Sequence, residues 1–274
     1  MNIITRFASL ALLLLAACTC QAAPDKYPRS LTDWTAVPAP SAGSADFQQA
    51  KFSRCDWHVF LRDGQPQVTL DLISPGKGKR QHSLLPFKFG EDSETNRDRT
   101  FYGRQFTTKV DDGWLVGFNA GEFGASLWWF SPDGHRRYKI SDDQVVEFLV
   151  TPMGLIALQG LAHLMMSEGS IIKLTKNAQG GWQSMVLAPL GDAPEAAALD
   201  ADGSLLVLTT RRQERVLPSG EVRVLLRDGV WWGFYPNSMV RARSGDFYVG
   251  MRYYVVRVRT GRAGTRLDWL LPSG

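Results

Sequence analysis

The stretch PNSMVRARSGDFYVGMRYYVVRVRTG, Pro236 to Gly261, contains two short apolar segments joined by a glycine turn and followed by a third. Valine and arginine alternate from Val256 to Arg259, which in a strand places the valines on one face and the arginines on the other. The same order, a glycine turn immediately before an apolar run, occurs around Gly113, Gly154 and Gly203. The stretch is therefore one unit of a repeat.

The turn glycines of the four units, the last at Gly245, are separated by 41, 49 and 42 residues. A third and a fourth apolar strand follow in each unit, and this period is typical of the four-stranded blades of a β-propeller. An Asp-Gly hairpin that begins at Asp56 predicts a further blade. We therefore predict an all-β fold, a β-propeller of about five blades with six as the alternative, over residues 52–274. A helix over Gly154–Met166 is a second interpretation of that segment, although Gly160 interrupts it.

Two segments, PNSMVRARSGDFYVGM and APEAAALDADGSLLVLT, resemble the strand-turn-strand unit of NHL-type and gluconolactonase-like propellers. The resemblance covers about the last two-thirds of the chain. The gluconolactonase-like resemblance implies one divalent cation such as calcium at the propeller axis, with an Asn of a Pro-Asn-Gly segment among its ligands. Pro236 and Asn237 match that segment, and Ser238 replaces the glycine. Under this alternative Asn237 is a ligand, and the further oxygen donors are Glu147, Asn119 or Glu195.

The resemblance is incomplete on the catalytic side, because no Asp aligns with the general base of that family. Asp200 is explained as a turn residue of LDADG. The sequence also lacks a GxSxG nucleophile turn, a glycine-rich phosphate loop and histidines at metal-ligand spacing. We therefore favour a non-enzymatic protein without a cofactor, and keep a metal-dependent lactone hydrolase as the alternative.

The first residues predict export. Arg6 precedes an apolar run over 7–17, which is typical of a signal peptide and too short to span a membrane. Leu15 to Cys18 resembles the lipobox of bacterial lipoproteins, which implies a signal peptide over 1–17, lipid attached to Cys18 and a tether over 18–51. Cleavage after this point is the alternative. The resemblance places the protein in the periplasm, anchored to the outer membrane. In an oxidising compartment Cys20 could pair with Cys55, or Cys55 could be a buried thiol.

The strongest candidate for a functional surface is aromatic and basic. From Ala201 onward the chain has 12 arginines, no lysine and six acidic residues. Aromatic and arginine side chains are enriched at binding hot spots. We predict a partner-binding surface made of eight residues, although some rings could instead fill the space between blades: Trp231, Trp232, Tyr235, Arg252, Tyr253, Tyr254, Arg257 and Arg259.

These patterns predict a binding platform whose partner is a protein of acidic surface. Nucleic acid is not the expected partner, because the chain is predicted to be exported. The two specific hypotheses are an immunity protein that neutralises a periplasmic toxin and an assembly factor of the cell envelope.

Overall fold

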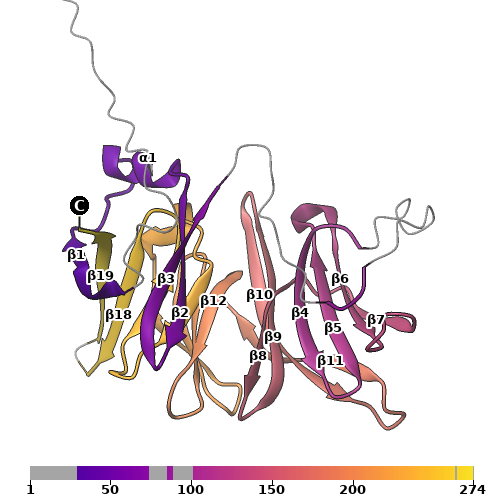
Figure 1. Cartoon of the computed structure of the whole chain (residues 1–274). Helices are drawn as coiled ribbons and strands as arrows, with labels where there is room; N and C mark the ends of the chain where they lie inside the picture. The colour runs from indigo at the N-terminus through magenta and orange to yellow at the C-terminus, as the bar shows by residue number, and fades with distance from the viewer. Residues whose placement is uncertain (1–29, 74–84, 89–100, 263, 274) are drawn as a thin grey trace, which may run out of the picture.

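A computed structural model describes residues 30–73, 85–88, 101–262 and 264–273. Five antiparallel sheets make up this part of the chain (Figure 1). The first two sheets are β2 (Cys55–Arg62) with β3 (Gln65–Leu72), and β4 (Arg104–Val110), β5 (Gly113–Asn119), β6 (Ala125–Phe130) and β7 (Arg137–Ser141). The third is β8 (Val145–Thr151), β9 (Gly154–His163), β10 (Met166–Lys176) and β11 (Trp182–Leu190).

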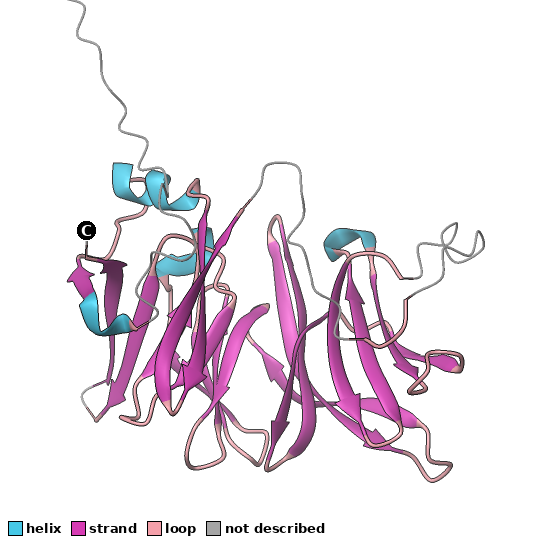
Figure 2. Cartoon of the chain, in the orientation of Figure 1, coloured by secondary structure: helices cyan, strands magenta, loops and turns pink. Residues whose placement is uncertain are grey.

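The fourth sheet is β12 (Pro194–Leu199), β13 (Leu205–Thr209), β14 (Gln213–Val216) and β15 (Val222–Leu226). The fifth is β16 (Ser238–Arg241), β17 (Phe247–Gly250), β18 (Val255–Gly261) and β19 (Gly264–Pro272), to which β1 (Trp34–Val37) adds a strand. The helical segments are α1 (Ala45–Lys51), η2 (Leu31–Asp33), η3 (Gly121–Phe123) and η4 (Val230–Gly233) (Figure 2).

The first strands of the sheets contact one another in the order β4, β8, β12, β16, β2. The sheets are therefore blades that stand around a common axis with their first strands innermost, and the all-β propeller prediction is confirmed. The repeat glycines turn the chain between first and second strands. Gly203 and Gly245 have φ of 80° and 94°, a region that glycine adopts without strain.

Strand β13 shows how the blades form one core. All five of its residues are buried, and alternate side chains point to opposite faces. Leu206 and Leu208 pack into the cluster shared with the fifth sheet, which includes Trp269. Leu205 and Val207 pack into the cluster shared with the third sheet. Strands buried on both sides are continuously apolar, as LLVLT is.

Residues 154–163 form strand β9 rather than a helix. Gly160 lies where the third and fourth sheets approach, and a Cβ there would lie 2.7 Å from Cδ of Pro194. The glycine that interrupts a helical pattern is thus required by packing between blades.

The tether prediction over 18–51 is wrong for residues 30–51, which belong to the folded body. β1 pairs with β19, and α1 begins at the N-cap Ser44, whose hydroxyl accepts a hydrogen bond from the backbone N–H of Phe47. Phe47 and Ala50 are buried in the largest core cluster. The small polar residues before α1 suggested a linker, whereas a serine cap and one buried ring are sufficient to anchor this short helix.

The predicted signal peptide over 1–17, the lipid site Cys18 and Cys20 lie outside the described residues. Cys55 is buried and forms a disulfide, which excludes the free-thiol interpretation. None of the helices in the described ranges has the length and apolar character needed to cross a membrane.

Candidate functional site

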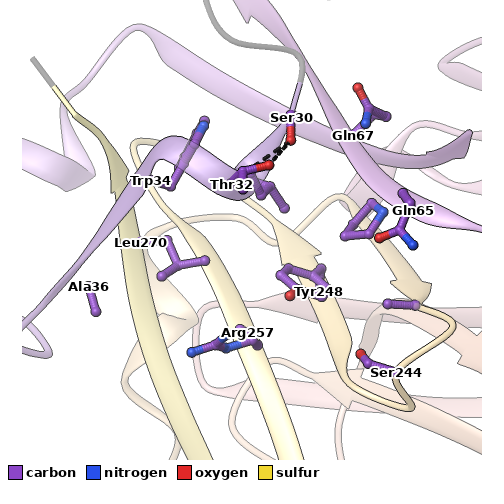
Figure 3. Close-up of a pocket in the computed structure, with 13 residues that line it drawn as sticks. Ser30, Thr32, Trp34, Ala36, Gln65, Gln67, Ser244, Tyr248, Arg257 and Leu270 are labelled. Carbon is purple, nitrogen blue, oxygen red and sulfur yellow. Dashed lines mark hydrogen bonds between the residues drawn. The ribbon is translucent and has the colours of Figure 1, made fainter.

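The propeller has two ends with different surfaces. Because strands alternate in direction, the starts of the innermost strands, η3, η4 and the β9–β10 turn lie at one end, which we call the upper rim; α1 precedes β2 at the same end (Figure 2). The opposite end contains the β2–β3 and β16–β17 turns. A cavity of about 630 Å³ lies near this lower end, between β3, η2, β1 and the fifth sheet (Figure 3).

The upper rim carries exposed rings on α1 and η4. Phe52, Trp232 and Tyr235 are 73%, 50% and 52% exposed. The ammonium of Lys51 lies 5.3 Å from the ring centre of Trp232, and the guanidinium of Arg252 lies 4.3 Å from that of Tyr235. We call these five residues the aromatic surface. Cations stacked on aromatic rings are held in place while the outer faces of the rings remain available.

Two tyrosines of this region have a backbone that favours glycine. Tyr235 has φ of 51° and Tyr253 has φ of 71°. Each such conformation costs on the order of 1 kcal/mol or more for a residue with a Cβ. The hydroxyl of Tyr253 accepts a hydrogen bond from Nε2 of Gln49 on α1, so this side chain helps attach the helix. Of the five described residues other than glycine with a positive φ, two are thus tyrosines at the upper rim; the others are Asp63, Leu164 and Asp228.

The structure corrects two aromatic members of the predicted partner-binding set. Trp231 is 1% exposed and Tyr254 is 3% exposed, and both pack in the core with Phe234 and Trp269. The neighbouring Trp232 is exposed, as predicted for the partner-binding set. The pair lies in the 3-10 helix η4, however, and the helical turn separates the two rings.

Arg257 and Arg259 form internal ion pairs rather than a free basic face. With Arg266 they surround Asp268, at nitrogen to oxygen distances of 2.9, 2.6 and 3.1 Å. Burial alone would raise the pKa of Asp268, but the hydrogen bond and charge of Arg257 and the charges of Arg259 and Arg266 hold it below 3.8. These arginines stabilise the outer strands β18 and β19 of the fifth sheet, and their charges are shared with Asp268.

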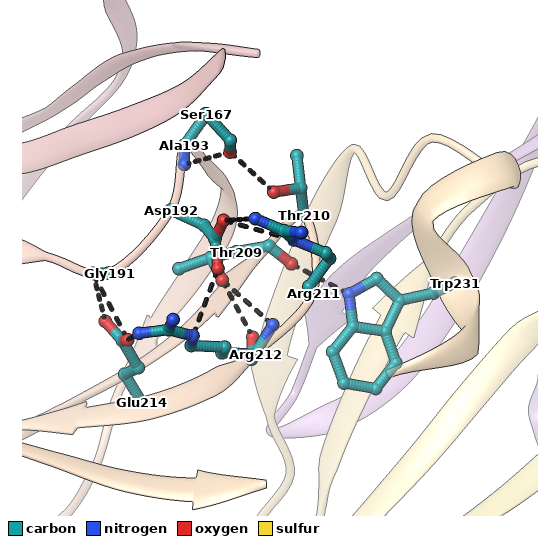
Figure 4. A network of polar contacts seen from close by, with 10 residues as sticks. All are labelled: Ser167, Gly191, Asp192, Ala193, Thr209, Thr210, Arg211, Arg212, Glu214 and Trp231. Carbon is teal, nitrogen blue, oxygen red and sulfur yellow. Dashed lines mark hydrogen bonds and ion pairs between the residues drawn. The ribbon is translucent and has the colours of Figure 1, made fainter. Parts of the chain in front are cut away.

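Other late arginines are also paired within the chain. Arg211 and Arg212 lie 2.7 and 3.1 Å from the carboxylate of Asp192, which is fully buried (Figure 4). The indole N–H of Trp231 donates to the carbonyl of Thr209 in the same turn. This network fixes η4 against the fourth sheet. It thereby positions Trp232 on the rim without forming a binding site itself.

Charged and amide side chains also gather at the upper ends of the innermost strands. Each of the five sheets contributes one residue: Asp56 on β2, Arg104 on β4, Glu147 on β8, Glu195 on β12 and Asn237 just before β16. Arg104 interacts electrostatically with all three carboxylates. We call this set the axial ring.

The two glutamates of the axial ring have strongly raised pKa values. Burial raises the pKa of Glu147 to about 7, against the opposing effects of the backbone N–H of Ala197 and the charge of Arg104. Burial likewise raises the pKa of Glu195 to about 7, opposed by Arg104. The carboxyl groups of Glu147 and Glu195 therefore change charge near neutral pH.

The residues expected to hold a divalent cation do not fit one. Asn237 donates to Asp56 at 2.7 Å, and its carbonyl oxygen accepts from the hydroxyl of Ser238 at 2.8 Å. The carbonyl oxygen of Asn119 accepts from the backbone N–H of Gly121 at 2.9 Å. The arginine of the axial ring already brings a positive charge to the carboxylates. Within the described ranges, no three His, Cys, Asp or Glu side chains are grouped as metal ligands.

The axial ring was only partly predicted. Glu147, Glu195 and Asn237 were named as oxygen donors, whereas Asp56 and Arg104 were not. Lys51 was also missed on the aromatic surface, because residues up to 51 were assigned to a tether, and so was Phe52, the first residue of the predicted propeller domain. Their signal was present in SADFQQAKF, where a cap residue, an acidic first turn and a basic last turn mark a short helix.

The fold and the two sites define a β-propeller with a polar axial ring and an aromatic upper rim. Three solved structures are similar to it over about three-fifths of this chain. A streptogramin B lyase aligns with 62% of this chain and 55% of its own at 15% identity and a TM-score of 0.41. A catalytically inactive virginiamycin B lyase from Staphylococcus aureus aligns with 61% of this chain and 56% of its own at 16% identity and a TM-score of 0.40.

A proposed gluconolactonase aligns with 63% of this chain and 69% of its own at 17% identity and a TM-score of 0.36. The chain thus spans little more than half the length of the two lyases. At these identities and scores the similarity carries no information about activity. No family model and no curated protein matches the sequence.

Proposed function

We propose that the protein is a non-enzymatic binding platform whose aromatic surface docks a protein partner. The observation that carries the proposal is the exposure of Phe52, Trp232 and Tyr235 together, each beside a fixed cation. Rings with a directional polar neighbour are typical of binding hot spots. Strained backbone at Tyr235 and Tyr253 further supports a role, because a glycine at either position would relieve the strain but would remove the aromatic side chain.

The charges of the surface favour an acidic partner. Lys51 and Arg252 flank the rings, and no ion pair joins either of them to a described carboxylate. Arg252 is held by donating to the backbone carbonyl of Lys51 at 2.7 Å, so its charge has no carboxylate partner among the described residues. We propose an acidic and apolar patch on the partner, such as the active site of a toxin that this protein neutralises or a component of an envelope assembly.

The test is site-specific photocrosslinking from position 232 in the native host, with position 186 as a matched control. Val186 is 64% exposed but lies on the outer strand β11, away from the upper rim. We expect one protein to be crosslinked from position 232 and not from 186. That protein, once purified, should bind about tenfold or more weakly to Trp232→Ser plus Arg252→Glu, and more weakly as salt is raised. Equal crosslinking from both positions, or unchanged affinity of the double variant, would refute the proposal.

We propose that the platform acts in the periplasm as a lipid-anchored protein of the outer membrane. The lipobox-like segment that ends at Cys18 supports this location. The Cys18→Ala variant should then lose lipid in mass spectra of the intact mature protein and leave the membrane fraction. A wild-type protein without lipid at this position would contradict the anchor while leaving the docking surface untouched.

A further inference from the structure

The cavity near the lower end lies on a different face from the aromatic surface and is not part of the proposed docking site. Three segments far apart in sequence build it: residues 30–36, residues 65–67 of β3, and side chains of the fifth sheet and its β16–β17 turn. Its volume of about 630 Å³ lies within the range of small-molecule sites. Cavities between packed elements of this size are common locations for ligands.

The lining is rich in uncharged hydrogen-bonding groups. Hydroxyl and amide side chains approach the cavity from opposite directions (Figure 3): Ser30, Thr32, Gln65, Gln67, Ser244 and Tyr248. Within the described part of the chain, no hydrogen bond is formed by the side-chain amide of Gln65 or of Gln67. Amides and hydroxyls both donate and accept, so the lining matches a ligand that presents both kinds of group.

The remaining lining supplies apolar contact and one charge, which is already paired. Trp34 and Leu270 form part of one wall, and both are at least nine-tenths buried. Arg257 is the charged residue among those that line the cavity, and it lies 2.9 Å from Asp268, a carboxylate that it shares with Arg259 and Arg266. The lining offers no carboxylate to a cation and no unpaired guanidinium to an anion, so it best suits a neutral ligand, which loses less hydration on entry.

We propose that this cavity binds a neutral polyhydroxylated ligand, of the class that includes mono- and disaccharides. Such ligands combine many hydroxyl groups with apolar C–H faces. The hydroxyls match Gln65, Ser244 and Tyr248, and the C–H faces match the wall that contains Leu270. The inference does not depend on the docking function.

The test is calorimetric titration of the full mature chain with four probes: glucose, N-acetylglucosamine, maltose and N,N′-diacetylchitobiose. Sodium gluconate and lysine serve as charged controls. We expect at least one neutral saccharide to bind with a dissociation constant of about 1 mM or lower, and both charged compounds to bind more weakly. Absence of binding by all four saccharides up to about 10 mM, or equal binding of a charged control, would overturn the proposal.

Two cavity variants, each with a matched control, test whether the saccharide binds in this cavity. Gln65→Ala combined with Tyr248→Phe removes hydrogen-bonding groups at exposed or half-buried positions and should weaken the saccharide about tenfold or more. Ala36→Trp, at an exposed position of the lining, should block the cavity. The matched controls are Gln183→Ala on β11 and Ala178→Trp in the β10–β11 turn, both exposed and remote from the cavity. Saccharide binding that survives both cavity variants would place the ligand elsewhere and reject the inference.

Discussion

Replacing both half-buried glutamates of the axial ring by glutamine should stabilise the protein above neutral pH. Burial holds the pKa of Glu147 and of Glu195 at about 7, compared with an ordinary value of 4.5. In the unfolded chain both carboxyls ionise near 4.5, so between this pH and 7 the folded state binds more protons than the unfolded state. The free energy of unfolding therefore falls as pH rises through this window and levels off above it.

The size of the effect follows from the same values. A carboxyl whose pKa is raised from 4.5 to about 7 reduces the free energy of unfolding by about 3 kcal/mol at pH 8 relative to a group that stays neutral. Both side chains keep partial exposure, which lowers the cost of ionisation. We expect the Glu147→Gln, Glu195→Gln variant to be about 2–4 kcal/mol more stable than the wild type at pH 8, and nearly equal to it at pH 4.5.

Urea unfolding followed by tryptophan fluorescence measures this difference, since the chain has nine tryptophans. Both proteins are measured from pH 4.5 to pH 8. The difference in their free energies of unfolding at each pH cancels the titration of all other groups. A variant that is no more stable than the wild type at pH 8, or a difference that is constant with pH, would refute the assignment of neutral, buried carboxyls to the axis.

Three further variants test the axial ring again and two other parts of the structure. Arg104→Met removes the charge that favours ionised Glu147 and Glu195, so the pH window in which stability falls should extend to higher pH, while its lower end, set by the unfolded chain, stays in place; an unchanged upper end would show that Arg104 does not act on them. Phe47→Ala should lower the free energy of unfolding by about 3 kcal/mol, because this ring is 2% exposed, and a loss below about 1 kcal/mol in urea unfolding would mean that α1 is not part of the core. Arg211→Ala with Arg212→Ala leaves Asp192 buried without its cations and should cost about 3 kcal/mol by the same assay, whereas full stability would contradict the network.

The sheet architecture could be predicted because each unit repeats the same local signals. Gly154, Gly203 and Gly245 fall in turns before apolar strands, and the structure places β9, β13 and β17 there. Such signals depend on a few neighbouring residues. The chain before residue 52 has no counterpart among the repeats, so the pairing of β1 with β19 could not be found from periodicity.

The axial ring could be predicted only in part, because its members are brought together by the arrangement of the five sheets around the axis and not by sequence. Glu147 and Glu195 lie near the starts of the first strands of consecutive units, 7 and 8 residues before the turn glycines Gly154 and Gly203, which a repeat comparison detects. Arg104 lies at the first residue of β4, directly after a segment without periodicity, and nothing local distinguishes it from a surface arginine. Whether a carboxylate at the axis meets a metal ion or a guanidinium is decided by this one residue from another blade.

The two neighbouring tryptophans show the same limit on the rim. Trp231 donates its indole N–H to Thr209 of the fourth sheet, whereas the ring of Trp232 lies 5.6 Å from that of Phe47 on α1. The sequence Trp-Trp gives no indication of which ring is buried. That depends on the contacts with Thr209 and Phe47, which lie 22 and 185 residues away in the sequence. The helix α1 therefore does more than cover the core. Because Phe47 supports one face of the Trp232 ring, the Phe47→Ala variant should also weaken partner binding, which ties the docking surface to the part of the chain that resembled a tether.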